Sequence, residues 1–146
     1  MSKIEHVEIF PVKVGLKTTF DIGTGFVGDT LSAGDHLFVK IITDDGFVGW
    51  GEQRALPSWN YETIESMVTT INNYIKPVLL RSNPLQINRI HQKISQIIKP
   101  SVSNGHPFAV AAVDIALHDL VGHMLGAPIH ALLGGKKYDQ LPLCYA

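Results

Sequence analysis

Two pairs of side chains that can exchange protons lie four residues apart in a stretch with helical spacing. Asp114 and His118 form one pair, and Asp119 and His123 form the other. A separation of four residues places both members of a pair on one helix face. Carboxylate and imidazole groups are metal ligands, but a structural zinc site needs four converging nitrogen or sulfur donors, and the single cysteine, Cys144, is distant in sequence. Capping and hydrogen bonds within the helix are the favoured interpretation, and the sequence predicts no metal site in this chain.

A glycine-rich segment offers a second chemistry, the binding of a dinucleotide. Residues 23–28, GTGFVG, match the pattern GxGxxG. That pattern binds a pyrophosphate only between a buried strand and the N-terminus of a helix. The residues that follow, DTLSAGD, disfavour a helix. We therefore interpret the segment as a glycine-rich loop and predict no nicotinamide or flavin cofactor.

The strongest signal for an element that could position such groups is the helical pattern within residues 106–135. Pro107 suits the first turn of a helix, where its missing N–H is not needed. Gly126 followed by Pro128 marks the end of that helix. Between them apolar residues leave only a narrow polar strip, which is typical of a buried helix. One further helical turn is predicted over residues 128–133.

Three strands are predicted ahead of this helix from apolar side chains that recur every second residue. Pro11 places the first strand near a sheet edge, and Gly46 supplies the positive φ of a hairpin turn between the second and third strands. Gly49 and Gly51 leave one face of the third strand bare, so another element is expected to pack closely against its backbone. The predicted strands are residues 7–14, 37–42 and 47–52.

Two amphipathic helices are predicted between the strands and the buried helix. The first covers residues 64–75, is capped by Ser58 or Asn60, and ends before Pro77. The second begins at Pro84. Strands followed by helices predict an α+β fold, in which a three-stranded antiparallel sheet packs on a helical bundle.

Length and composition narrow the class of protein. A chain of 146 residues forms one domain with a substantial core, and 45% hydrophobic residues exclude a disordered chain. A net charge of −1 without a basic run argues against binding to nucleic acid or to an anionic membrane. The single cysteine predicts a reducing compartment. Since we find neither a leader sequence nor an apolar run long enough to span a bilayer, we expect a soluble, cytoplasmic protein.

The amino-acid sequence of the C-terminal third resembles that of a known family. The residues AAVDIALHDLVGHMLGAPIHALLGG, followed by LPLCYA, are similar to the end of the N-terminal capping domain of the enolase superfamily, in its mandelate racemase/muconate lactonizing enzyme branch. His118 stands where that family often has tryptophan, a difference that concerns packing. The family's capping domain has the same order of strands and helices. The resemblance implies that residues 1–126 are this domain, and that residues 127–146 are a short helix and the first strand of an absent catalytic (β/α) barrel.

Two segments outside the core pattern are the candidates for function: residues 16–35 and residues 53–59. The first shows no sustained period, and irregular connections longer than ~12–15 residues are usually functional or mobile. In the family, loops at these positions close over the mouth of the barrel and select the substrate. Ordinary surface loops without a ligand are the alternative interpretation. The resemblance implies that the substrate-binding candidates are Thr18, Thr19, Phe20 and Ile22 on the first loop, and Arg54, Ala55 and Trp59 on the second.

Enolase-superfamily enzymes abstract a proton next to a carboxylate. A lysine or histidine acts as the base, and Mg²⁺ stabilises the enediolate. In the family, the bases and three acidic metal ligands lie on strands of the barrel. The resemblance therefore implies Mg²⁺ and a small carboxylate substrate for the full-length enzyme, and no catalytic residue or cofactor in this chain. We expect the 146-residue chain alone to be inactive.

Three interpretations of the chain stay open. It is the capping part of a racemase, epimerase, cycloisomerase or dehydratase, a free-standing module that binds a small ligand or a protein, or a structural remnant without activity. The segment LPLCYA favours the first, because an independent domain has little use for one strand of a barrel. Without its expected partner, the barrel, that strand at residues 141–146 is expected either to dock on a second copy, giving a concentration-dependent homodimer, or to extend into solvent.

Overall fold

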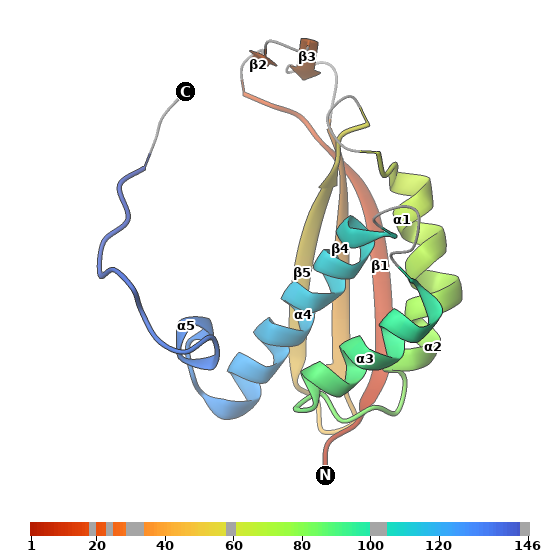
Figure 1. The fold of residues 1–146 in the computed structure, drawn as a ribbon, viewed down its shortest axis with the longest axis vertical. Coiled ribbons are helices and arrows are strands. Elements are labelled where there is room, and N and C mark those ends of the chain that lie inside the picture. Colours follow the sequence, from red (N-terminus) through yellow and green to blue (C-terminus); the bar gives the residue numbers. More distant parts are fainter. Residues whose placement is uncertain (18–19, 23–24, 29–33, 58–60, 100–104, 144–146) are drawn as a thin grey trace.

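A three-stranded antiparallel sheet and the long helix α4 (Pro107–Leu125) form the centre of the fold (Figure 1). The computed structural model describes residues 1–17, 20–22, 25–28, 34–57, 61–99 and 105–143, with backbone only for 20–22 and 25–28. The main sheet has the order β1-β4-β5, and β2 pairs with β3 in a separate two-stranded sheet. The predicted α+β fold is confirmed. The strands are β1 (Ile4–Val14), β2 (Phe20–Ile22), β3 (Gly25–Gly28), β4 (Gly34–Thr43) and β5 (Val48–Ala55).

Burial along the central strand shows how the sequence sets the two faces of the sheet. Leu37, Val39 and Ile41 of β4 are fully buried, and the residues between them point to the opposite face, since side chains alternate along a strand. β1 lies at one edge of the sheet, as Pro11 predicts. Gly46 has a φ of 88° in the turn between β4 and β5, which confirms the predicted hairpin.

The contact between β5 and α4 is as close as the two glycines of β5 predict. A methyl group on Gly51 would overlap the carbonyl oxygen of Ala112, and one on Gly49 would overlap the carbonyl oxygen of Ala116. Only glycine leaves room for the helix backbone at this separation. The helix ends at Gly126 in the left-handed conformation, with a φ of 60°, as predicted.

The first predicted helix is present, but its predicted caps are wrong. Helix α1 (Ile64–Thr70) begins after Thr63, whose hydroxyl accepts a hydrogen bond from the Ser66 N–H at 3.2 Å. The Ser66 hydroxyl accepts one from the Thr63 N–H at 3.0 Å, which completes a capping box. Ser58 and Asn60, the predicted caps, lie outside the described residues.

This helix also continues past Pro77, against the prediction. After α1 comes a π-helical turn, η1 (Ile71–Ile75), and then α2 (Lys76–Leu79). The N–H of Lys76 donates to the carbonyl of Ile71, one residue further back than in an α-helix. Pro77 therefore occupies the first turn of a new α-helical segment, where it needs no N–H.

The next helix, α3 (Ile87–Ile97), begins later than Pro84, where it was predicted to start. The residues that were predicted to begin this helix instead form a turn around Asn83. The Asn83 carbonyl accepts a hydrogen bond from the Gln86 N–H at 3.1 Å, and its side chain accepts one from the Leu85 N–H at 3.0 Å. An asparagine that bonds the backbone two residues ahead favours a turn over a helix.

By length and composition, α4 is the one helix among the described residues that could cross a membrane. Its position in the fold gives a different reason for its apolar character. It lies across β5 and β4 (Figure 1), and a core helix of a soluble protein passes the same test. We conclude that α4 is a buried core helix, as predicted. Its buried residues are Ala109, Ala112, Val113, Ala116, Leu117, Leu120, Val121 and Gly122.

The predicted C-terminal strand is absent from the part of the chain that the structure describes. After the short helix α5 (Ile129–Leu132), residues 133–143 form neither helix nor strand, and residues 144–146 lie outside the description. Leu141 is 74% exposed and Leu143 is 93% exposed. A strand forms only beside another strand, and no described strand lies beside this segment (Figure 1). It extends into solvent in the single chain, and the homodimer stays a prediction.

Candidate functional site at the loop end of the sheet

The two candidate loops lie at the same end of the main sheet, although they are distant in sequence. Val14, the last residue of β1, pairs with Gly34, and Asp35 pairs with Ala55, the last residue of β5. We call this edge, formed by Val14, Gly34 and Ala55, the loop end. The β2–β3 hairpin connects β1 to β4 there (Figure 1), and residues 56 and 57 follow the end of β5 at the same place. The sheet therefore presents both loops on one side of the molecule.

The first loop contains more regular structure than its sequence predicts. Phe20 and Ile22 belong to β2, where Phe20 pairs with Gly28 and Ile22 with Gly25. Strands of three and four residues are too short for a period of two to stand out, so the prediction of an irregular connection was wrong here. Thr18, Thr19 and Trp59, the other candidates without a strand assignment, lie outside the described residues.

Arg54 and Ala55 also belong to a strand, since β5 extends to Ala55 and includes the start of the predicted second loop. Ala55 is 4% exposed and faces the core, so it serves packing. Arg54 faces the opposite side. Its guanidinium lies over Gly34, where an added methyl group would be 2.9 Å from the Arg54 Nε and Nη2 atoms. Glycine at position 34 thus makes room for a planar cation at the loop end.

An unpredicted hydrogen bond between a histidine and a carboxylate lies beside Arg54 on the same face of the sheet. His36 Nδ1 lies 2.6 Å from Glu52 Oε1, and His36 pairs in register with Arg54. The face therefore carries a carboxylate, an imidazole and a guanidinium on neighbouring strands. A guanidinium matches the planar geometry of a carboxylate better than any other side chain, so Arg54 is suited to a carboxylate ligand.

A buried carboxylate lies three residues beyond the second loop, beside the start of α4. Glu62 is 2% exposed and accepts hydrogen bonds from the N–H groups of Phe108, at 2.6 Å, and Ala109, at 3.3 Å. His106 Nδ1 lies 3.6 Å from the same carboxylate. Glu62 thus caps the N-terminus of α4, where a negative charge is favourable.

Sequence reasoning missed Glu62, although one signal was available. The residue before α4 is His106, and it makes no side-chain capping bond. A long buried helix without Ser, Thr, Asp or Asn at its start needs a cap from elsewhere in the chain. The sequence does not say which distant residue supplies it.

The two Asp–His pairs of α4 have structural roles, as predicted. His118 Nδ1 donates to the Asp114 carbonyl oxygen at 2.9 Å and lies 3.3 Å from its carboxylate. His91 Nε2 of α3 lies 2.6 Å from the same carboxylate, so Asp114 joins the two helices. Among the residues that the structure describes, no group of three His, Cys, Asp or Glu side chains could hold a metal ion.

The second pair covers the free edge of β5. The Trp50 N–H donates to the Asp119 carboxylate at 2.8 Å, and His123 Nδ1 donates to the Val48 carbonyl at 2.8 Å. Unpaired groups at a sheet edge attract other strands. Asp119 and His123 satisfy two of these groups from α4, which fixes the helix along the strand.

Comparison with known proteins gives consistent results along the chain. A sequence profile of the family described as "Mandelate racemase / muconate lactonizing enzyme, N-terminal domain" matches residues 7–134. N-succinyl-L-Arg/Lys racemase of Bacillus cereus is 32% identical over 143 residues, which are 98% of this chain and 36% of the relative. Muconate cycloisomerase 1 of Acinetobacter baylyi is 36% identical over 119 residues, which are 80% of this chain and 31% of the relative. The chain spans well under half the length of these curated relatives.

In solved structures, too, the chain matches about a third of the length of each similar protein. The crystal structure of N-succinyl Arg/Lys racemase from Bacillus cereus matches with a TM-score of 0.82 and 31% identity, over 94% of this chain and 35% of that one. The dipeptide epimerase from Enterococcus faecalis, complexed with Mg and the dipeptide L-Leu-L-Tyr, matches with a TM-score of 0.77 and 34% identity, over 91% and 35%. The fold of this chain is therefore the fold of one part of each enzyme.

Proposed function

The chain belongs to the mandelate racemase/muconate lactonizing enzyme family, and on that premise we propose that it is the substrate-capping domain of a magnesium-dependent enzyme acting next to a carboxylate. One observation carries the proposal. The relatives are named for an N-succinyl amino acid, muconate and a dipeptide, and each of these compounds carries a carboxylate. Racemases, epimerases, cycloisomerases and dehydratases in this family share one chemical need, the handling of a proton next to that group.

The loop end is the part of this chain that we propose to meet the substrate. Arg54 provides a cation for a carboxylate there, and Glu62, three residues beyond the second loop, is hydrogen-bonded to the start of α4. Loops that close over a reaction exclude water and strengthen the electrostatic interactions inside. The proposed substrate-binding residues are Thr18, Thr19, Phe20, Ile22, Arg54 and Trp59.

The metal ion and the catalytic base are proposed to belong to another part of the protein. The described residues of this chain offer no group of three His, Cys, Asp or Glu for a metal ion. Mg²⁺, when bound in such an enzyme, neutralises the charge of the enediolate. We propose that residues 1–126 are the capping domain, that residues 127–146 lead into a barrel, and that the protein acts in a reducing, cytoplasmic compartment.

The proposal is tested first on the coding sequence and then on the product. We expect the reading frame to continue past Ala146 into a Lys-x-Lys segment and spaced acidic residues. The longer product should exchange the proton next to the carboxylate of N-succinyl amino acids or dipeptides for deuterium in a Mg²⁺-dependent way. The 146-residue chain should not. A stoichiometric magnesium site on the chain alone, or exchange catalysed by it, would contradict the proposal.

The role of Arg54 has its own test in the longer product. Arg54→Gln should raise KM for the carboxylate substrate about 10- to 150-fold, since a charge-assisted hydrogen bond contributes about 1.5–3 kcal/mol. Lys13→Gln, which removes a cation that lies 4.0 Å from Asp35 near the same end of the sheet, should leave KM unchanged. An equal effect of the two substitutions would show that only the general charge of the loop end matters.

A further inference from the structure

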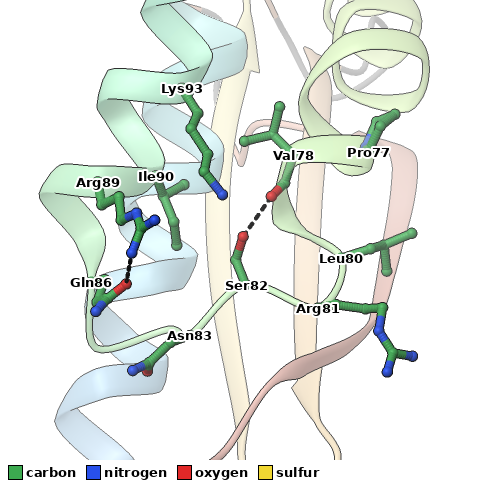
Figure 2. Close-up of a pocket in the computed structure, with 10 residues that line it drawn as sticks. All are labelled: Pro77, Val78, Leu80, Arg81, Ser82, Asn83, Gln86, Arg89, Ile90 and Lys93. Atoms are coloured by element: carbon green, nitrogen blue, oxygen red, sulfur yellow. Dashed lines mark hydrogen bonds between the residues drawn. The ribbon is translucent and has the colours of Figure 1, made fainter.

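A hollow of about 330 Å³ lies between α2 and α3, and we call it the α2–α3 hollow. Val78 and Ser82 form one side, and Gln86, Arg89 and Lys93 follow one face of α3 on the other (Figure 2). Buried Ile90 lies between them. The Ile4 N–H donates to the Ser82 carbonyl at 3.0 Å, so the hollow lies near the start of β1, at the opposite end of the sheet from the loop end.

The charges around the α2–α3 hollow are all of one sign. Arg81, Arg89 and Lys93 line it, and no carboxylate does. The whole chain has 12 basic and 13 acidic residues, so this excess of cations is local. Within the described part of the chain, Lys93 has no ion pair and Arg89 has only the Gln86 Oε1 atom, at 3.4 Å.

The two cations on α3 are placed unfavourably for an empty site. Arg89 and Lys93 are four residues apart on one helix face, where like charges repel. Arg89 also lies in the first turn of α3, beside the positive end of the helix dipole, and that turn contains no acidic residue. An anion between the two side chains would offset both effects.

Figure 2 shows which of the cations are directed toward the hollow. Lys93 extends across it toward Val78, and Arg89 lies against Gln86 with its guanidinium turned inward (Figure 2). Arg81 points away from the hollow. The Ser82 hydroxyl already donates to the Val78 carbonyl at 2.7 Å. Arg89 and Lys93 are therefore the charged donors directed toward a ligand in the hollow.

We propose that the α2–α3 hollow binds a phosphate group, carried either by free phosphate or by a phosphate monoester. The Arg89 guanidinium is a planar fork that binds two phosphate oxygens, and the Lys93 ammonium adds a point charge. The volume of the hollow lies at the lower end of the range of small-ligand sites. This site is independent of the function proposed for the loop end.

The test is a titration of the 146-residue chain with sodium phosphate at constant ionic strength, followed by amide NMR shifts. We expect saturable shifts confined to residues 78–93, with a Kd of about 1 mM. Arg89→Gln and Lys93→Gln should each weaken binding about tenfold, while Lys93→Arg should retain it. Lys137→Gln, which removes an exposed cation beside Tyr138, is the matched control and should bind like the unchanged chain.

Two further measurements decide the outcome. Glycerol 3-phosphate that binds as tightly as free phosphate identifies a monoester site, and binding of free phosphate alone identifies an inorganic ion site. Both support a phosphate site. The proposal is overturned if no saturable shift occurs below about 20 mM phosphate, or if Lys137→Gln weakens binding as much as Lys93→Gln. The amide spectrum of each variant shows whether it is folded.

Discussion

Leucines in two regions of this molecule have opposite environments. Leu117 and Leu120 of α4 are fully buried against the sheet, whereas Leu141 and Leu143 of the C-terminal segment are exposed. The residue type is the same, and the segments follow one another in the chain. The difference lies in the partner. Helix α4 packs against β5, whose glycines leave room for the helix backbone. Residues 136–143 have no strand beside them in the described structure.

This contrast supports the proposal that residues 1–126 form a domain by themselves and that residues 127–146 lead into another part of the protein. Sheet and helices complete one another's hydrogen bonds and apolar surface, as Asp119 and His123 show at the edge of β5. The C-terminal segment carries apolar side chains without burying them. This exposure is what the proposal that residues 127–146 lead into a barrel would produce in the chain by itself.

The largest effect is expected from truncating one leucine in each region. Leu120→Ala removes a fully buried side chain and should lower the free energy of unfolding by about 3–4 kcal/mol. Leu143→Ala should change it by less than about 0.5 kcal/mol, since Leu143 is exposed. Urea unfolding with a constant m-value measures both. Equal losses would remove the contrast between the two regions.

A pair of glycine substitutions tests why α4 has its partner. Gly51→Ala should destabilise the fold by about 3 kcal/mol, because the methyl group would overlap the Ala112 carbonyl oxygen. In Gly126→Ala the methyl group would have open space around it. The free energy of unfolding should fall only by the cost of a φ of 60° at alanine, about 1 kcal/mol. Thermal unfolding of the two variants compares them. A greater loss in Gly126→Ala would contradict the close contact.

Glu62→Gln tests the cap at the start of α4. The amide loses the charge and one acceptor oxygen for the Phe108 and Ala109 N–H groups, and we expect a loss of about 2 kcal/mol. Glu5→Gln, at an exposed position of β1, is the matched control and should lose less than about 0.5 kcal/mol. The free energy of unfolding in urea measures both. Similar losses would show that Glu62 is not a buried cap.

The smallest effect concerns pH and the turn between β4 and β5. Hydrogen bonds from the Ser2 and Thr43 hydroxyls hold the pKa of Asp45 below its ordinary value of 3.8. A lowered pKa stabilises the folded chain above the ordinary value, and this stabilisation is lost as the pH falls through the folded pKa. The fall in Tm between about pH 5 and pH 3 should therefore be smaller in Asp45→Asn than in the unchanged chain. Asp139→Asn, at an exposed position of the C-terminal segment, should not reduce it.

Features set by nearby residues were predictable from the sequence. The ends of α4 follow from Pro107 and Gly126, and the close contact with β5 follows from Gly49 and Gly51. In each case the signal lies within the element that it describes. The order of strands and helices then predicted the α+β fold, and the amino-acid sequence of α4 and the residues after it indicated the family.

Features that depend on distant residues were not predictable in the same way. Glu62 caps a helix whose second residue, Phe108, lies 46 positions later in the chain. The hairpin of β2 and β3 has strands too short for a period, and the π-helical turn before Pro77 removes the constraint that should have ended the helix. The strand predicted at residues 141–146 stays a prediction for the barrel, because its expected partner was predicted to lie outside this chain.

Hydrogen exchange of the backbone amides in the 146-residue chain tests the central claim most directly. If the sheet and helices are a complete core, amides of residues 39–41 and 112–120 should exchange only through global unfolding. Amides of residues 136–143 should exchange at nearly the rate of an unstructured peptide. Protection of residues 136–143 comparable to that of α4 would contradict the account, and so would rapid exchange throughout α4.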